Sequence, residues 1–353
     1  MADTLPVVPD PRTTGPLVSI LVPAYNAEAH LREALDSILA QTYRHIEVVL
    51  LDDASTDRTP EIAAEYAGRI QYARQPKNKG IFGNVNDGIA RARGDLLAVY
   101  HSDDVYLPTM VEEQVAYLKQ HPEVGAVFCS DIFIDAKGRE YGRLSLPREV
   151  RGEQPLDYET VLNAVLTYKN RFLVCPTAMV RASVQHDAGA YRQDRYGIAA
   201  DLEMWLRIAR RHPLAVLESH LIRYRHFHGN ATQQYFHLRT TPENQFVVLD
   251  DYLAEGGHAL ATPAALVSYE AHRSEDRLMA AIAHYIKGEL PQGRLALRDV
   301  QLGAIVRSPQ VQRWRLLVLF AGLWGLLRLP RAELVAKRMY DRWHVKRSPV
   351  PRG

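Results

Sequence analysis

The chain has 353 residues, enough for one large domain with an appendage or for two modest domains. Its formal net charge of +2 argues against a nucleic-acid-binding protein. The two cysteines, Cys129 and Cys175, lie in separate apolar runs, which argues against a disulfide framework and a zinc site and indicates a reducing compartment.

The first 16 residues contain four prolines among mostly polar residues. They lack the basic start and apolar core of a secretory signal. We therefore expect residues 1–16 to form a flexible leader.

Strand-like and helix-like segments alternate over the next 110 residues. Helices are predicted to follow Asn26 as an N-cap, to start at Thr59 with Pro60, and to span about 82–93 and 108–120. Continuous apolar runs predict the strands, at Leu17–Val22, Ile46–Leu51, Ile70–Ala73, Leu96–Tyr100 and Val124–Cys129. This alternation predicts an α/β fold with a doubly wound, mostly parallel sheet.

Two of these strands end in acidic pairs. Asp52-Asp53 follows one strand and Asp103-Asp104 follows another. Right-handed crossovers bring such strand ends to one edge of the sheet, where open α/β sheets bind their ligands. Ionised carboxylates that lose hydration there need a cation or hydrogen-bond donors. The alternative for the second pair is a solvated turn before a helix N-terminus.

The chain contains neither G-x-G-x-x-G nor G-x-x-x-x-G-K-[ST], so no glycine-rich loop would bind phosphates. A bound diphosphate would then need a divalent cation and basic side chains. Lys79, Lys77 and Arg74 are available for this, although a lysine-rich loop is commonly just solvated.

Two blocks resemble the nucleotide-binding half of the family 2 inverting glycosyltransferases, which have the GT-A fold. The blocks are VSILVPAYNAEAHLREALDSILAQTYRHIEVVLLDDASTDRT and, in the same order as in the family, NKGIFGNVNDGIARARGDLLAVYHSDD. The resemblance covers about residues 17–135, which we expect to form the nucleotide-sugar-binding half of the domain.

The resemblance implies a role for each matching residue. Pro23 and Tyr25 would border the base, and Asp53 would accept hydrogen bonds from it. Asp103 would contact the ribose or support the metal, and Asp104 would ligate Mn²⁺ or Mg²⁺ on the donor diphosphate. In the common family pattern, Asp-Ala-Asp-Asp, the first carboxylate stands where this chain has His101. A metal ligand, a phosphate contact and a plain turn residue are all open for His101, and we favour the last.

Residues 136–238 are expected to form the acceptor-binding half. The pattern predicts a hairpin over Asp131–Arg151, a strand-like segment over Lys169–Val180 and a last strand at Val216–Ile222. Asp201 stands at the start of a helix with one apolar stripe, and the resemblance implies that it is the catalytic base. The alternative is a carboxylate favoured by the helix dipole alone.

The run Tyr224–Asn230 resembles the family block Tyr-Arg-x-His, with His226 or His228 in the histidine position. We take His228 as the second metal-site residue. A polar surface loop is the alternative.

Residues 239–353 are predicted to be helical. Within them, residues 314–329 form a possible membrane-surface helix. Its uninterrupted apolar run, Leu316–Leu327, is bracketed by Arg315 and Arg328 and followed by a basic tail, but it is too short to span a bilayer. These features favour a helix lying on an anionic membrane surface. A buried helix or a homodimer contact are the alternatives.

Together, these patterns predict a metal-dependent inverting glycosyltransferase that uses a nucleotide-diphosphate sugar donor and a glycan or lipid-linked acceptor. We expect it to act in cell-surface polysaccharide or glycolipid synthesis, in the cytoplasm and peripherally on the inner face of the cell membrane. The rival hypotheses are a catalytically silent GT-A scaffold and a nucleotidyltransferase.

Overall fold

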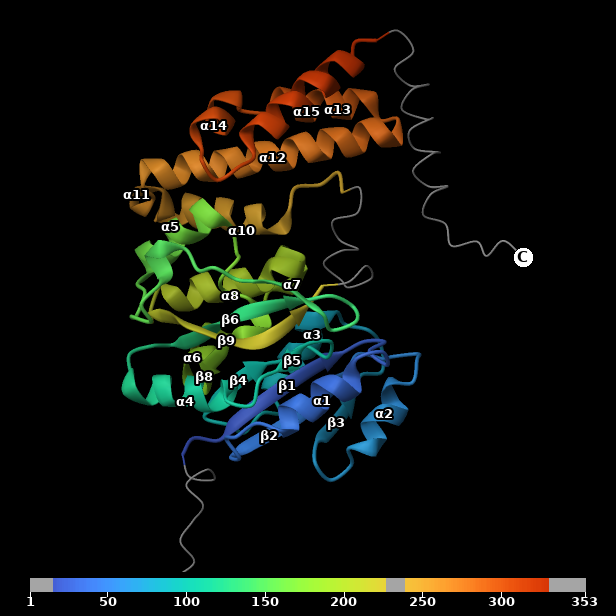
Figure 1. The fold of residues 1–353 in the computed structure, drawn as a ribbon, viewed down its shortest axis with the longest axis vertical. Coiled ribbons are helices and arrows are strands. Elements are labelled where there is room, and N and C mark those ends of the chain that lie inside the picture. Colours follow the sequence, from blue (N-terminus) through green and yellow to red (C-terminus); the bar gives the residue numbers. More distant parts are fainter. Residues whose placement is uncertain (1–14, 227–238, 330–353) are drawn as a thin grey trace, which may run out of the picture. The chain divides into compact units, whose positions relative to one another are not determined.

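The computed structural model describes residues 15–226 and 239–329. The chain divides into two compact units (Figure 1). The first contains residues 1–162 and 170–227, and the second contains residues 163–169 and 228–353. Most of the predicted leader, His228 and nearly all of the basic tail lie outside the described residues.

The first unit is built on a nine-stranded sheet with the order β3-β2-β1-β4-β8-β6-β9-β5, in which β7 pairs with β6. The four strands β3, β2, β1 and β4 are mutually parallel, and β6 and β9 are also parallel. The strands are β1 Val18–Ala24, β2 Ile46–Asp52, β3 Gln71–Arg74, β4 Leu96–Val99, β5 Val105–Tyr106, β6 Ala126–Ile134, β7 Glu140–Arg143, β8 Met179–Arg181 and β9 Leu214–Arg225.

Helices cover both faces of this sheet, which explains why its central strands are mostly apolar and are buried at nearly every position. Ile20 and Val22 of β1 pack with apolar side chains of α1 and α4, whereas Leu51 of β2 lies against α3, where it leaves no room for a Cβ on Gly88. The helices of this unit are α1 Leu31–Leu39, α2 Thr59–Glu65, α3 Ile81–Ile89, α4 Met110–Gln120, the first part of α5 Tyr158–Tyr168, α6 Ala182–Ala188, α7 Gln193–Tyr196 and α8 Ala200–Ala209; residues 163–168 of α5 belong to the second unit.

The register of the parallel strands shows where the edge of the sheet that was predicted to hold the site lies. Ala24 pairs with Asp52, and Leu21 pairs with Val99. The strand ends that carry the acidic pairs are therefore neighbours, because β2 and β4 both flank β1. The predicted α/β architecture with a helical C-terminal extension is confirmed.

Three local predictions were wrong. Asn26 does not cap α1, because it takes a positive φ of 50° and its side-chain oxygen accepts a hydrogen bond from the backbone N–H of Thr56. The strand-like segment predicted over Lys169–Val180 is largely irregular and contributes only the start of β8, after a single 3₁₀ turn that contains Pro176. The helix predicted to reach Arg93 ends at Ile89.

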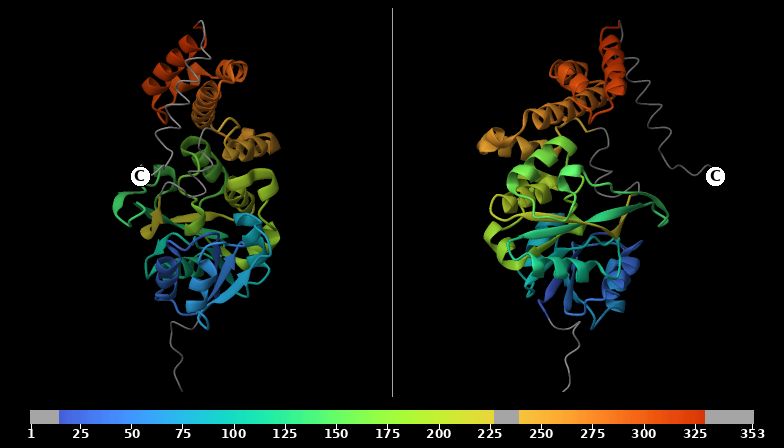
Figure 2. Two further views of the ribbon diagram at one scale, coloured as in Figure 1. Left: turned by 90° about the vertical axis from the view of Figure 1, so that its right-hand side faces the viewer. Right: turned by 60° about the vertical axis from the view of Figure 1, so that its left-hand side comes forward.

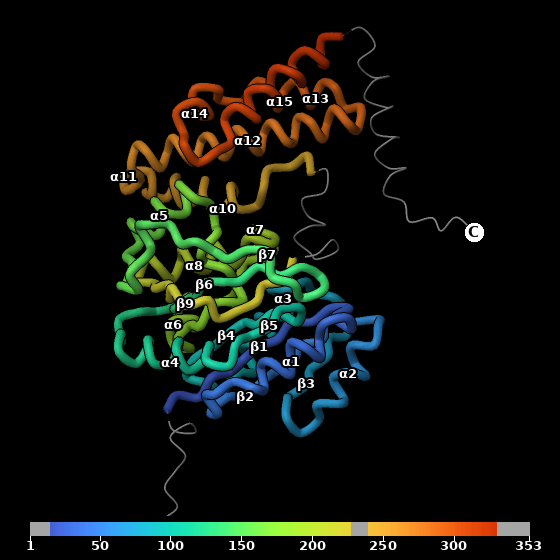
Figure 3. The backbone as a smooth tube through the Cα atoms, viewed as in Figure 1, coloured from blue at the N-terminus to red at the C-terminus, as the bar shows by residue number. Residues whose placement is uncertain are grey.

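The second unit is helical in its described part, with α12 as its longest element. Figures 2 and 3 show α13, α14 and α15 lying along it. The elements are α10 Asn244–Tyr252, a kinked segment Leu253–Gly257 with non-helical backbone at Glu255 and Gly256, α11 His258–Leu260, α12 Pro263–Lys287, α13 Leu290–Arg298, α14 Leu302–Arg307 and α15 Arg313–Leu326. Within residues 15–226 and 239–329, no helix has both the length and the hydropathy that crossing a membrane requires.

Candidate active site

The ends of β1 and β2 bring together most of the residues predicted to bind the nucleotide. Pro23 is buried in β1, and Tyr25, just beyond the strand, is 53% exposed. Asp52 is fully buried, but its carboxylate oxygens accept hydrogen bonds from the Ser55 backbone at 2.8 Å and the Tyr72 hydroxyl at 2.6 Å. Asp52 therefore has a structural role, and the second acid of the pair is the one available to a ligand.

That second acid, Asp53, holds the loop between β3 and α3. Its two carboxylate oxygens accept hydrogen bonds from the backbone N–H groups of Lys79 at 2.8 Å and Gly80 at 2.9 Å. Burial raises the pKa of Asp53, and these two bonds oppose the shift. Each oxygen keeps a second lone pair for a ligand. The side chain of Lys79 is paired with Asp87, so a diphosphate would have to compete for it.

The loop that follows β4 gathers three side chains able to ligate a metal. One ligand atom from each of His101, Asp103 and Asp104 lies within 4.8 Å of the others. Asp104 is fully buried; its Oδ1 accepts the backbone N–H of Arg225 at 2.8 Å, and its Oδ2 lies 3.8 Å from Nδ1 of His101. Among the described residues, Oδ2 of Asp104 and Nε2 of His101 have no hydrogen-bond partner.

Burial disfavours the charged forms of Asp104 and His101 in this cluster. It raises the pKa of Asp104 well above its ordinary value, and the neighbouring Asp103 adds to the rise. Burial also lowers the pKa of His101, which favours the neutral imidazole that ligates metals. Unpartnered buried oxygen and nitrogen atoms of this kind fit a dication such as Mn²⁺. The sequence favoured a plain turn residue at His101, whereas the structure brings its imidazole into the cluster.

Arg225, the last residue of β9, supports this loop from beneath. Its guanidinium donates to the backbone carbonyl oxygens of Asp103 at 2.8 Å and Asp135 at 3.2 Å, and it pairs with Glu33 of α1 at 2.6 Å. The side chain is almost fully buried. One arginine therefore joins the candidate metal loop, the turn after β6 and a helix from the start of the chain.

Asp201 lies in the first turn of α8 and is partly exposed. One of its oxygens accepts the backbone N–H of Leu202 at 2.7 Å. Burial raises the pKa of Asp201 to about 7, a value suited to a general base. Glu203, two residues on, is instead fully buried and pairs with Arg207 at 2.7 Å and Arg192 at 3.2 Å, so it supports the helix.

The charges of Asp201 and of the metal-ligand cluster both act on the hydroxyl of Tyr224. The pKa of this hydroxyl is raised well above the ordinary value. Burial is the largest cause, and the charges of Asp104, Asp103, Asp131 and Asp201 add to it. The phenol is therefore within electrostatic reach of both the candidate metal site and the candidate base. We refer to Asp103, Asp104, Asp131 and Asp201 together as the acidic site, because the charge of each acts on this phenol.

Asp131 of β6 was not predicted as a site residue. It is buried, its Oδ1 has no hydrogen-bond partner among the described residues, and burial raises its pKa to about 7. A carboxylate inside an otherwise apolar strand was the signal available in the sequence. Gln193 was also missed: its Oε1 accepts the backbone N–H of Phe82 at 2.8 Å, and its Nε2 donates to the carbonyl oxygen of Lys79 at 2.8 Å.

Of the two candidate histidines, only His226 lies in the described part of the chain. Its ring is hydrogen-bonded to the Tyr141 hydroxyl and packs with Phe133 at 5.3 Å and Tyr224 at 4.9 Å between ring centroids. Burial lowers its pKa, and the charge of Asp103 opposes that shift. His226 thus joins an aromatic cluster next to the acidic site.

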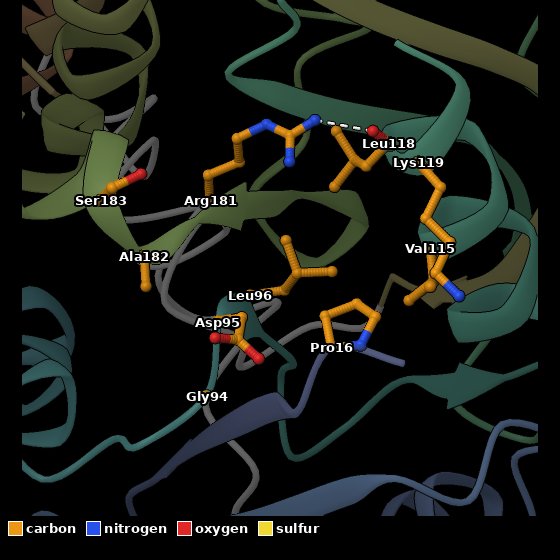
Figure 4. Close-up of a pocket in the computed structure, with 10 residues that line it drawn as sticks. All are labelled: Pro16, Gly94, Asp95, Leu96, Val115, Leu118, Lys119, Arg181, Ala182 and Ser183. Atoms are coloured by element: carbon orange, nitrogen blue, oxygen red, sulfur yellow. Dashed lines mark hydrogen bonds between the residues drawn. The ribbon is translucent and has the colours of Figure 1, made fainter. Parts of the chain in front are cut away.

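A pocket at the other edge of the sheet contains none of the predicted site residues (Figure 4). Its volume is about 330 Å³, and Arg181 in it donates to the Leu118 carbonyl oxygen at 2.7 Å. Pro16 and Asp95 place it at the amino ends of β1 and β4. It is therefore separate from the acidic site at the carboxyl ends.

Comparisons with known proteins agree with this geometry. The model of the family "Glycosyl transferase family 2" matches residues 19–188. The chain is 34% identical over 199 residues to "Putative glycosyltransferase EpsE" of Bacillus subtilis, covering 55% of this chain and 67% of that protein. It is 31% identical over 217 residues to an uncharacterized glycosyltransferase of Rickettsia felis, but it spans only 35% of that protein's length.

Two solved structures share the fold at low identity. Staphylococcus aureus TarS 1-349, in complex with UDP, has a TM-score of 0.54 at 14% identity, covering 95% of this chain and 93% of that one. The mannosyltransferase PcManGT of Pyrobaculum calidifontis, in complex with GDP-Man and Mn²⁺, has a TM-score of 0.52 at 19% identity, covering 97% and 91%. The family model and the Bacillus relative together show that this chain belongs to glycosyltransferase family 2.

Proposed function

We propose that this protein is a metal-dependent inverting glycosyltransferase that moves a sugar from a nucleoside diphosphate to an acceptor hydroxyl. The observation that carries the proposal is the cluster of His101, Asp103 and Asp104 at the carboxyl end of β4, which contains two buried ligand atoms without partners. Membership of the family argues against the nucleotidyltransferase hypothesis.

The donor class is supported by what the two structural relatives bind. TarS was solved with UDP and UDP-GlcNAc, and PcManGT with GDP-Man and Mn²⁺. In this chain Pro23 and Tyr25 would border the base, and Asp53 would accept its hydrogen bonds. Asp103 would contact the ribose, and Lys79 would neutralise phosphate charge.

A divalent cation would be held by Asp104 with Asp103 and His101, and His228 is a further predicted ligand. When bound, the ion supplies charge stabilisation for the departing diphosphate. Asp104 fits this role because its Oδ2 is buried without a hydrogen-bond donor among the described residues, a costly state for a carboxylate that no cation offsets.

Asp201 would act as the general base. With a pKa of about 7 it is substantially ionised at neutral pH, and it would accept the proton of the acceptor hydroxyl as that oxygen attacks the anomeric carbon. A positioned base contributes about a hundred- to ten-thousand-fold to the rate. Attack opposite the leaving diphosphate inverts the configuration without a covalent intermediate.

A glycan acceptor is supported by the aromatic cluster of Phe133, Tyr141 and His226. Tyr141 is 59% exposed and stacks on Phe133 with 6.1 Å between ring centroids. Such an exposed aromatic face suits the apolar C–H face of a sugar ring. The cluster lies beside Tyr224, which contacts His226 and responds to the charges of the acidic site.

The first test is a thermal-shift screen of UDP, GDP, CDP and dTDP, each with and without Mn²⁺. We expect one nucleotide to raise the melting temperature only when Mn²⁺ is present. Asp104→Asn should abolish this shift. Asp157→Asn is the matched control, because Asp157 starts α5 and its carboxylate accepts only local hydrogen bonds from Thr160 in the described structure.

A metal-independent shift, or no shift at millimolar nucleotide, would contradict the donor-site assignment and support the silent scaffold. Once the donor is known, the product's anomeric configuration is read by NMR. A retained configuration would exclude the single displacement that we assign to Asp201.

A further inference from the structure

Helix α15 in the second unit presents an apolar face to solvent. Trp314 is 72% exposed and Val318 71%, and Leu329, in the turn after the helix, is 49% exposed. The opposite face packs into the C-terminal hydrophobic core through Leu316 and Leu323. Both faces of α15 are therefore apolar, and only one of them is covered within the described residues.

The exposed residues form one stripe. Trp314, Val318, Ala321 and Leu329 are exposed and Gly325 is partly exposed, and the five recur at helical spacing. The small residues Ala321 and Gly325 leave the middle of the stripe flat. From Trp314 to Leu329 the stripe extends about 22 Å at 1.5 Å per residue, which is too short for a bilayer core of about 30 Å.

Arginines border the stripe, and the acidic residues nearest to it in sequence are Asp299 before it and Glu333 after it. Residues 300–329 contain four arginines and neither aspartate nor glutamate; the arginines are 307, 313, 315 and 328. The guanidinium of Arg328 lies 3.5 Å from the ring centroid of Trp324 and donates to its carbonyl oxygen. None of the four is within ion-pair distance of a carboxylate of the described residues.

We propose that this arginine-bordered stripe docks on the surface of an anionic phospholipid bilayer, with α15 parallel to the membrane plane. Apolar side chains would enter the boundary of headgroups and acyl chains, and the arginines would contact lipid phosphates. Tryptophan prefers that boundary because its ring is apolar and its N–H is polar.

The positive charge along the stripe favours a membrane over a second copy of the chain as the partner that covers it. A two-fold contact places the same patch on both partners, so it would bring the arginines of one copy against those of the other. Like charges in a contact oppose association. An anionic bilayer instead offers the opposite charge over the whole stripe.

The test uses the full chain and sedimentation with vesicles of phosphatidylcholine, alone or with about 30% phosphatidylglycerol. Each arginine near an anionic surface contributes about fivefold to binding. Allowing for screening by salt, we expect at least about twentyfold tighter binding to the anionic vesicles.

Val318 supplies the matched pair of variants. Val318→Asp should weaken binding to anionic vesicles by at least about tenfold, while Val318→Leu should bind like the wild type. Because the side chain is 71% exposed, both variants should keep the wild-type melting temperature. Tryptophan fluorescence should shift to the blue with vesicles, and Trp314→Ser should reduce that shift.

Three results would overturn the proposal. The first is that the wild type binds no vesicles, and the second is that Val318→Asp binds vesicles as tightly as the wild type. The third is that the protein is a dimer in solution and that Val318→Asp converts it to a monomer. The last result would assign the stripe to a second copy. No nucleotide is present in these experiments, so their failure leaves the proposed transferase activity untouched.

Discussion

Replacing Asp201 by asparagine should abolish transfer and at the same time stabilise the protein. Burial raises the pKa of this carboxyl to about 7, against an ordinary value of about 3.9. A group whose pKa is raised by folding binds its proton more tightly in the folded state. Its contribution to stability is therefore fully present at low pH and is lost as the pH rises from about 4 through 7.

The size of the effect follows from that shift. Three pKa units correspond to about 4 kcal/mol at pH 8. The Asp201 side chain is partly exposed, so solvent screening reduces this, and we expect Asp201→Asn to gain about 2 kcal/mol at pH 8. For a unit of this size that is a rise in melting temperature of about 4–8 °C. At pH 5.5 the gain should be about half as large.

The assay is thermal unfolding of wild type and Asp201→Asn at pH 5.5 and 8, with turnover measured on the same samples. Asp157→Asn is the control: hydrogen bonds from Thr160 lower the pKa of Asp157, so its loss should not stabilise the fold at either pH. If Asp201→Asn melts at or below the wild-type temperature at pH 8, the carboxyl is not strained by burial. Our assignment of a base poised near neutrality would then fail.

Further predictions concern the pH dependence of the rate, the removal of Arg225 and the strained backbone at Ala54. The wild-type kcat/KM should fall about tenfold per pH unit below 7, because protonated Asp201 cannot accept a proton; a flat profile between pH 5 and 7 would place the base elsewhere. Arg225→Ala should cost about 3 kcal/mol in chemical denaturation and raise the Mn²⁺ concentration needed for half-maximal stabilisation by nucleotide. Arg223→Ala, which removes only an ion pair between part-exposed side chains, should cost less than about 1 kcal/mol. Ala54 has a φ of +63°, so Ala54→Gly should raise stability by about 0.5–1 kcal/mol; a loss of stability would mean that its methyl group packs usefully.

The sequence predicted well those features that depend on neighbouring residues. Apolar runs located the central strands, and the acidic pair Asp103-Asp104 was placed at the carboxyl edge of the sheet because parallel strands end together. The sequence alone could not show that the Asp52 carboxylate accepts a hydrogen bond from the Tyr72 hydroxyl, because that contact depends on the register of β2 and β3.

Long-range contacts account for most of what was missed. Arg225 reaches Asp103 across 122 residues, and Gln193 reaches Phe82 across 111. The imidazole of His101 joins the carboxylates because of the shape of a turn that contains no distinctive residue. Asn26 follows a general capping preference in the sequence, but a hydrogen bond to Thr56 of the neighbouring loop overrides that preference.

In the proposed reaction, Arg225 would link the donor site to the acceptor site. One buried guanidinium donates to the carbonyl oxygens of both Asp103 and Asp135, so it joins the candidate metal loop to the hairpin that carries Tyr141 of the aromatic cluster. An acceptor that shifted this hairpin would then alter the affinity for the nucleotide, and by thermodynamic linkage the nucleotide would alter the affinity for the acceptor by the same factor. That coupling would pass through a single side chain.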